Sequence, residues 1–176
     1  MPEPIEITKM RENANNREYV LKAVNENGKL LEFAADELHN DREVVFDAVK
    51  NNPEALEFAS LNLKKDREIV YESVSKLGWT YCYADESLKS DKELLIAGLE
   101  KSGQILYFAS QKMRDDKDVI LKAIEDKPII IKYASKRMRN DLDVGMSVMN
   151  KNKKCFKFLE PELQKNEKIQ EIKNAE

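Results

Sequence analysis

The sequence DREVVFDAVKNNPEALEFASLNLKKD, from Asp41 to Asp66, decides the fold of this chain. Its two ends carry the same residue type 25 positions apart, and this spacing recurs along the whole sequence. The markers at this interval are Asn16, Asp41, Asp66, Asp91, Asp116, Asp141 and Asn166. A fixed period of this length is typical of tandem-repeat proteins. The sequence therefore predicts six copies of 25 residues, with no insertion in any copy.

Each marker is predicted to cap the start of a helix. We number repeat positions from the marker, which is position 0. An Asp or Asn side chain there accepts hydrogen bonds from free backbone N–H groups, and an acid at position 2 suits the positive end of the helix dipole. Apolar residues at positions 3, 4, 7 and 8 lie on one helical face. In the second copy they are Val44, Val45, Ala48 and Val49.

A second helix is predicted after position 12, where glycine or proline ends the first one. Apolar residues at positions 15, 17, 18 and 22 form another helical face, with aromatic side chains at 17 and mostly alanine at 18. We expect two helices of roughly ten residues in each copy, with the aromatic column buried beside the alanines. Apolar residues at position 5, such as Phe46, predict that the first helix is covered on several sides. Because helices this short are marginal alone, the copies must stack.

The predicted fold is all-α: an α-solenoid of six 25-residue helix-turn-helix repeats with a short C-terminal capping helix. In the capping helix, Ile169 and Ile172 are expected to cover the last repeat. The predicted segments are a polar leader (1–15), the repeats 16–40, 41–65, 66–90, 91–115, 116–140 and 141–165, and a C-terminal tail (166–176).

The stretches Asp41–Asp66 and Asp116–Asp141 resemble the tandem repeat family known as domain of unknown function 4116. The resemblance covers about residues 16–165, and the last copy departs from it at Gly145, Leu159 and Pro161. It implies tandem helical repeats. It implies no activity, because none is established for the family.

The composition argues against several classes of protein. Charged residues make up 36% of the chain, yet 30 Lys and Arg nearly balance 33 Asp and Glu, for a net charge of −3. No apolar run approaches the roughly 18 residues of a membrane span, so no membrane partner is expected. One His and two Cys argue against a structural zinc site, and no cofactor is expected. Two distant cysteines favour a reducing compartment, so we expect a cytoplasmic protein.

The chain is not expected to be an enzyme. It has no P-loop, dinucleotide fingerprint or HExxH motif. His39 is interpreted as a solvated residue at a helix C-terminus, and Cys82 and Cys155 as inert thiols. The acidic residues at position 2 allow two interpretations: a series of metal ligands, or ion pairs with the basic residues at position 1. Ion pairing is the favoured interpretation. That basic column comprises Arg17, Arg42, Arg67, Lys92 and Lys117.

Positions 13, 16 and 20 are predicted to form the solvent face of the second helix. In the middle copies this face carries apolar side chains where charged ones are expected: Leu61, Trp79, Cys82, Tyr107 and Ile129. Exposed Trp and Tyr are typical of binding hot spots. The favoured function is therefore a non-catalytic scaffold that binds a protein or peptide along this face. The alternative is that these side chains fold onto their neighbours.

Acidic residues are concentrated in the N-terminal part of the chain and basic residues in the C-terminal part. Residues 1–60 hold 7 basic and 13 acidic side chains, a net charge of −6, whereas residues 111–157 hold 13 and 7, a net charge of +6. We expect Glu54 and Glu57 to meet a basic stretch of the partner, and Lys132, Lys136 and Lys157 an acidic one. The same polarity predicts a monomer or weak self-association.

Nucleic acid is the alternative partner. It would bind the basic C-terminal third, residues 111–157, with Tyr107 or Trp79 stacking on a base.

Overall fold

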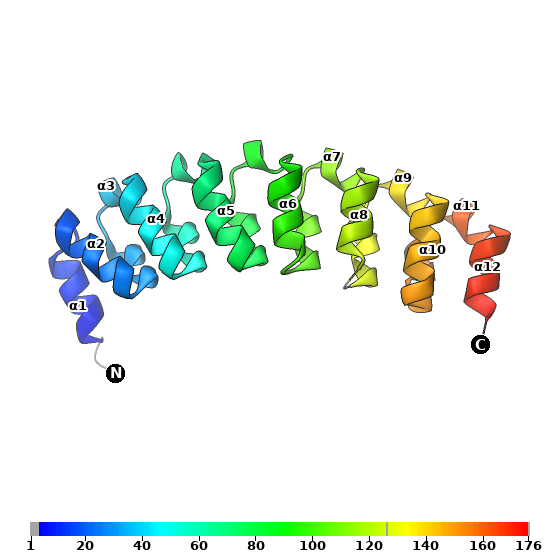
Figure 1. Cartoon of the computed structure of the whole chain (residues 1–176), viewed down its shortest axis with the longest axis horizontal. Coiled ribbons are helices and arrows are strands. Elements are labelled where there is room, and N and C mark those ends of the chain that lie inside the picture. Colours follow the sequence, from blue (N-terminus) through cyan, green and yellow to red (C-terminus); the bar gives the residue numbers. More distant parts are fainter. Residues whose placement is uncertain (1–3, 126, 176) are drawn as a thin grey trace. The chain divides into compact units, whose positions relative to one another are not determined.

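The computed structural model describes residues 4–125 and 127–175, and in these residues it contains helices and turns but no strand (Figure 1). The chain is therefore all-helical, as predicted. It divides into two compact units, unit 1 (Met1–Leu88) and unit 2 (Lys89–Glu176). No helix in the described residues is both long enough and apolar enough to cross a bilayer.

A long α-helix begins one residue after every marker, which confirms the predicted starts. Asp41 shows the reason: its Oδ1 accepts hydrogen bonds from the backbone N–H groups of Glu43 and Val44, each at 3.1 Å. Within each unit, consecutive helices of this kind lie side by side (Figure 1). They are α2 (Arg17–Glu26), α4 (Arg42–Asn51), α5 (Arg67–Lys76), α6 (Lys92–Leu99), α8 (Lys117–Ala123), α10 (Leu142–Lys151) and α12 (Glu167–Asn174).

The predicted second helix of about ten residues is wrong. Each copy instead has a six-residue 3-10 helix and then a single helical turn. The 3-10 helices are η1 (Gly28–Phe33), η2 (Pro53–Phe58), η4 (Gly78–Tyr83), η6 (Gly103–Phe108), η7 (Pro128–Tyr133) and η8 (Lys153–Phe158). The following turns are α3 (Asp36–His39), η3 (Leu63–Lys65), η5 (Glu86–Leu88), α7 (Gln111–Arg114), α9 (Lys136–Arg139) and α11 (Pro161–Gln164).

The break falls at positions 18 and 19 and has a local cause. Ala109, at position 18, has an extended backbone with φ −70° and ψ 152°. The next residue, Ser110, caps the following turn by accepting from the N–H of Met113. The N–H of Ser110 donates to the carbonyl of Lys89 in the preceding copy at 3.1 Å. The interruption therefore provides a backbone link between neighbouring copies.

This backbone link recurs in both units. The N–H at position 19 donates to the carbonyl at position 23 of the preceding copy in the pairs Ser60–His39, Asp85–Lys64, Ser110–Lys89, Ser135–Arg114 and Glu160–Arg139. In the first copy the N–H of Ala35 donates in the same way to the carbonyl of Ala14 in the leader.

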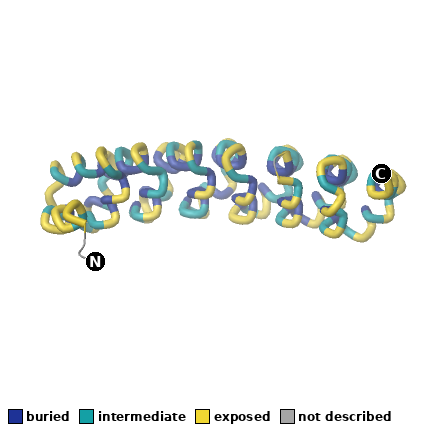
Figure 2. The backbone as a smooth tube through the Cα atoms, turned by 90° about the horizontal axis from the view of Figure 1, so that it is seen from below, coloured by how far each residue is buried: buried dark blue, intermediate teal, exposed yellow. Residues whose placement is uncertain are grey.

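The core of each unit lies between its α-helices and its 3-10 helices (Figure 2). Position 8 is buried in every copy, as are most residues at positions 3, 4, 14 and 15. The glycines at position 12 do not end the first helix through a left-handed backbone, since no described glycine has a positive φ. Instead they permit close approach: a Cβ on Gly28 would lie 2.2 Å from the carbonyl oxygen of Ala48.

The alanine column is buried as predicted, but the aromatic column at position 17 is not. Ala59, Ala84 and Ala109 are at most 6% exposed, whereas Phe108 is 44% exposed. With three residues per turn, position 18 follows the buried position 15 on the inner side, whereas position 17 is the last residue of the 3-10 helix and is only partly covered. The expectation for position 5 is met in part, because five of its side chains are partly buried but Tyr71 is exposed.

The two ends of the chain differ in how well they were predicted. Within the polar leader lies an unexpected helix, α1 (Ile5–Glu12), whose Met10 is fully buried. At the other end α12 is confirmed: Ile169 is buried, Ile172 is partly buried, and Lys168 faces solvent.

Candidate functional site

Two rows of exposed side chains form the candidate site, one in each unit. They occupy positions 13 and 16 of the 3-10 helices, which share a face because side chains three apart eclipse, and position 20 of the next turn. The unit 1 row is Lys29, Glu32, Asp36, Glu54, Glu57, Leu61, Trp79, Cys82 and Glu86. The unit 2 row is Gln104, Tyr107, Gln111, Ile129, Lys132, Lys136, Lys154, Lys157 and Pro161. That the two rows join into one continuous surface remains a prediction.

The unit 1 row carries three of the predicted apolar residues. Leu61 is 75% exposed, whereas Trp79 is 37% exposed and is thus partly covered within its unit. The Trp79 ring meets Tyr83 edge-on, with centroids 5.4 Å apart. This contact orients the indole while leaving part of it in solvent. Cys82 is only partly exposed.

The two acids predicted to meet a partner in unit 1 already have contacts in their own chain. Glu54 forms an ion pair with Lys29 at 2.6 Å. Glu57 accepts a hydrogen bond from the Tyr83 hydroxyl at 2.9 Å. Burial and this hydrogen bond raise the pKa of Tyr83, so the phenol stays protonated as a donor. Glu54 is therefore paired with a charge of its own unit, whereas Glu57 keeps its charge and holds the Tyr83 ring that Trp79 contacts.

The unit 2 row has a larger aromatic surface than predicted. Tyr107 is 59% exposed and Ile129 is 47% exposed. The Tyr107 ring makes edge contacts with Phe108 at 5.1 Å and with Tyr133 at 5.3 Å, so three rings from two copies form a cluster. The sequence interpretation missed Phe108 and Tyr133 because it placed position 17 in the core. The three-residue period of a 3-10 helix does not identify them either, because it places position 17 on the same side as the buried position 14.

Two lysines of the unit 2 row contact aromatic rings at position 17. Lys132 Nζ lies 4.7 Å from the centroid of Tyr133, and Lys157 Nζ lies 5.1 Å from that of Phe158. Such contacts are cation–π interactions, which hold the ammonium groups close to apolar surface. Lys136, in the first turn of α9, is also exposed. Lys132 and Lys157 thus lie against aromatic rings, and all three predicted lysines of unit 2 are exposed.

The acidic column at position 2 pairs with the basic column, as the favoured interpretation predicted. Arg17 contacts Asp41 at 2.7 Å and Glu43 at 2.5 Å in the next copy, and Lys117 contacts Asp141 and Asp143 in the same way. The hydrogen bond from Arg17 lowers the pKa of Asp41. No group of three or more metal-ligating side chains occurs within residues 4–125 and 127–175. The column therefore has a structural role.

The lone histidine and the second cysteine also have structural roles. The sequence predicted a solvated His39, but this prediction is wrong. His39 is partly buried, and its Nε2 lies 2.8 Å from the carbonyl oxygen of Leu31. Gln164, at the same repeat position, donates from Nε2 to the Leu159 carbonyl at 2.8 Å. Cys155 is buried, and burial raises the pKa of its thiol, which agrees with an inert residue.

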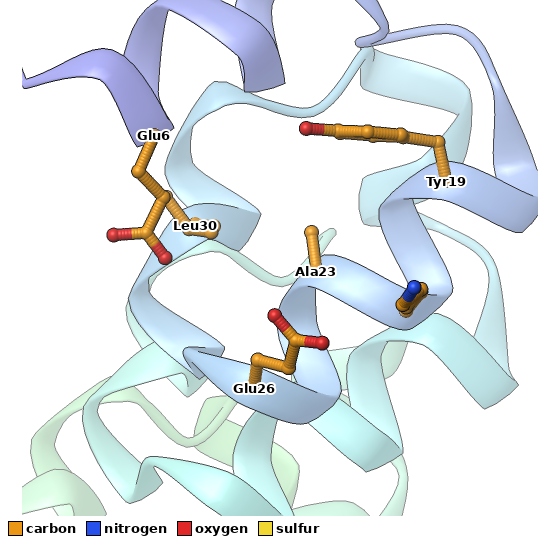
Figure 3. A pocket seen from close by; sticks show the side chains of 6 residues that line it. Glu6, Tyr19, Ala23, Glu26 and Leu30 are labelled. Atoms are coloured by element: carbon orange, nitrogen blue, oxygen red, sulfur yellow. The ribbon is translucent and has the colours of Figure 1, made fainter.

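A hollow of about 240 Å³ lies where α1 meets α2 and η1 in unit 1 (Figure 3). Its lining is Glu6, Tyr19, Lys22, Ala23, Glu26 and Leu30. Tyr19 and Ala23 occupy positions 3 and 7, which are buried in the next copy. The hollow therefore remains because α1 covers the first copy less completely than a full repeat does. None of the predicted binding residues lines it.

The capped helices and their recurring links define an all-helical tandem-repeat protein. The family model described as Domain of unknown function (DUF4116) matches residues 16–64, 66–114 and 116–164. The chain therefore belongs to this family of tandem repeats. No curated protein and no solved structure matches the chain.

Proposed function

We propose that the chain is a non-catalytic scaffold, an α-solenoid of six 25-residue repeats, that binds a protein or peptide along its exposed rows. The recurring caps, the position-19 backbone links and the ion pairs between copies support the regular repeat. Every copy has the same length, so no inserted loop carries additional chemistry. What varies from copy to copy is the set of side chains at positions 13, 16 and 20.

The exposure of Tyr107 and Ile129 carries the proposal. Both side chains stand in solvent, and at the equivalent positions the last copy has lysines, Lys157 and Lys154. Tyr107 is already held by Phe108 and Tyr133, so a partner that buries it need not order a mobile ring. Pre-ordered aromatic side chains with a charged rim are typical of interface hot spots.

The charges of the rows set the expected chemistry of the partner. Lys132, Lys136 and Lys157 favour an acidic segment with an apolar side chain that reaches Tyr107. In unit 1, Glu54 and Glu57 favour a basic segment near Trp79. Each rim contact contributes little affinity alone but sets orientation and association rate.

Binding of the full chain to an array of random peptides tests this function. We expect selection of peptides rich in Asp or Glu with an apolar residue, and loss of their binding in the double variant Tyr107→Ser, Ile129→Ser. The matched control is Gln104→Ser, Gln111→Ser, which changes two neighbouring polar side chains of the same row. No selection above background, or equal binding by both variants, would contradict the proposal.

Nucleic acid is the second candidate, because the unit 2 row combines four lysines with an exposed tyrosine and has no acid. Phosphate contacts release counterions, so RNA affinity would fall steeply as salt rises. Titration of labelled poly(U) at several salt concentrations tests it. Tight, strongly salt-dependent binding that Lys132→Glu weakens would favour RNA over a peptide.

A further inference from the structure

The two rows have opposite charge although they occupy the same repeat positions. The unit 1 row holds five carboxylates and one lysine, a net charge of −4. The unit 2 row holds four lysines and no acid, a net charge of +4. Surfaces of equal and opposite charge attract, and each suppresses contact with its own kind.

Several of these charges are free to pair with another molecule. Glu32, Asp36 and Glu86 are exposed, and their carboxylates make no hydrogen bond or ion pair to any residue that the structure describes. The ammonium groups of Lys136 and Lys154 are likewise exposed and unpaired within the described ranges. These five charged groups can therefore face a second row without breaking an internal ion pair.

The apolar side chains of the two rows are complementary in kind. Unit 1 presents Leu61 and Trp79 among acids, and unit 2 presents Tyr107 and Ile129 among lysines. Pairing the rows would remove apolar surface from water while acids face lysines around it. It would also offer the Trp79 face to a lysine, as Lys132 already meets Tyr133.

We infer that the unit 1 row of one molecule docks on the unit 2 row of a second molecule of the same protein. The contact is weak and reversible, because its charges remain at the rim and are screened by salt. This inference goes beyond the proposed function, because the partner that binds each row is a second molecule of the same protein and no other partner is required.

Analytical ultracentrifugation of the full chain tests the inference. In about 20 mM salt, where charges interact over tens of ångströms, the weight-average sedimentation coefficient should rise with protein concentration. In about 500 mM salt, where the screening length is a few ångströms, this rise should largely disappear. A chain that sediments as a monomer at every concentration in low salt would overturn the inference.

Charge reversal locates the contact. The unit 1 variant is Asp36→Lys, Glu86→Lys, and the unit 2 variant is Lys132→Glu, Lys136→Glu. Each variant alone should associate about tenfold or more weakly than the wild type, because the altered row has a net charge of zero and no longer attracts the opposite row. A mixture of the two should associate again, since the acidic row of one then faces the basic row of the other.

The controls carry the same change of net charge away from the rows. They are Glu12→Lys, Glu18→Lys in unit 1 and Lys101→Glu, Lys168→Glu in unit 2, all at exposed positions. Each control should self-associate like the wild type. Equal loss of association in row variants and controls would overturn the inference by showing a net-charge effect. Circular dichroism of every variant verifies that it is folded. Peptide selection on the array is a separate measurement, so the two proposals fail independently.

Discussion

Unit 1 and unit 2 are built on the same framework but present different surfaces. In both units the marker residue caps an α-helix, a six-residue 3-10 helix follows, and the backbone at position 19 links one copy to the preceding one. At positions 13, 16 and 20, however, unit 1 is acidic around Trp79 and unit 2 is basic around Tyr107. The buried positions therefore give both units the same fold, whereas the side chains of the rows differ in charge and apolar content.

The largest expected effect tests the shared framework. Leu56 in unit 1 and Leu106 in unit 2 occupy position 15, and both are fully buried. Leu56→Ala and Leu106→Ala should each lower the free energy of unfolding by about 2–5 kcal/mol through lost burial and a cavity. Chemical denaturation followed by circular dichroism measures this loss. A large cost in one unit and none in the other would mean that the two cores are not equivalent.

Overpacking the alanine column should have a smaller effect. Ala84 and Ala109 are buried at position 18, where the extended backbone joins two helical segments. Ala84→Leu and Ala109→Leu should each cost about 1–3 kcal/mol, because the added atoms find no space. Thermal unfolding measures the loss. An unchanged melting temperature in either variant would show that this column tolerates larger side chains.

The aromatic column should be less sensitive still. Phe108 is 44% exposed, so Phe108→Ala should cost roughly 1–2 kcal/mol, less than the 3–5 kcal/mol typical of a fully buried Phe. The same substitution at the partly buried Phe58 in unit 1 provides the comparison. Denaturation of both variants measures the difference. A cost above 3 kcal/mol for Phe108→Ala would place this ring in the core after all.

Much of this framework is predictable from the sequence. Capping residues and apolar spacing give the starts of the α-helices, since both act over one or two turns. The break at Ala109 and Ser110 was missed because apolar residues at intervals of three fit both an α-helix and a 3-10 helix. The Ser110 cap is the local signal that separates them. Helix α1 lies outside the repeat, so periodicity gives no information about it.

The candidate site was predictable in part. Leu61, Trp79, Tyr107 and Ile129 are exposed as expected, because positions 13, 16 and 20 face outwards in either kind of helix. The internal contacts of Glu54 and Glu57 depend on side chains from other elements, Lys29 and Tyr83, which local spacing does not reveal.

Acid should weaken both units slightly through their marker residues. The pKa of both Asp41 and Asp116 is lowered. For Asp41 the main cause is the hydrogen bond from Arg17. For Asp116, burial alone would raise the pKa, but the hydrogen bonds from Lys92 and from the N–H of Val119 outweigh it. A carboxyl with a lowered folded-state pKa stabilises the fold above its unfolded pKa of about 3.9 and loses that contribution as pH falls through the folded value.

The variants Asp41→Asn and Asp116→Asn keep the helix cap but remove this titration. Denaturation at a series of pH values from 7 to below 4 should show a smaller loss of stability in each variant than in the wild type. Identical acid dependence in all three proteins would exclude these carboxyls as contributors.

The affinity of one array-selected acidic peptide for the full chain tests the central claim, that the unit 2 row binds through Tyr107. Fluorescence anisotropy would give the dissociation constant for the wild type, Tyr107→Ser and the control Gln104→Ser. A hot-spot residue contributes about 2 kcal/mol or more, so Tyr107→Ser should weaken binding roughly 30-fold while the control stays within a few-fold of the wild type. Equal affinity for all three proteins would contradict the claim and place the binding surface elsewhere.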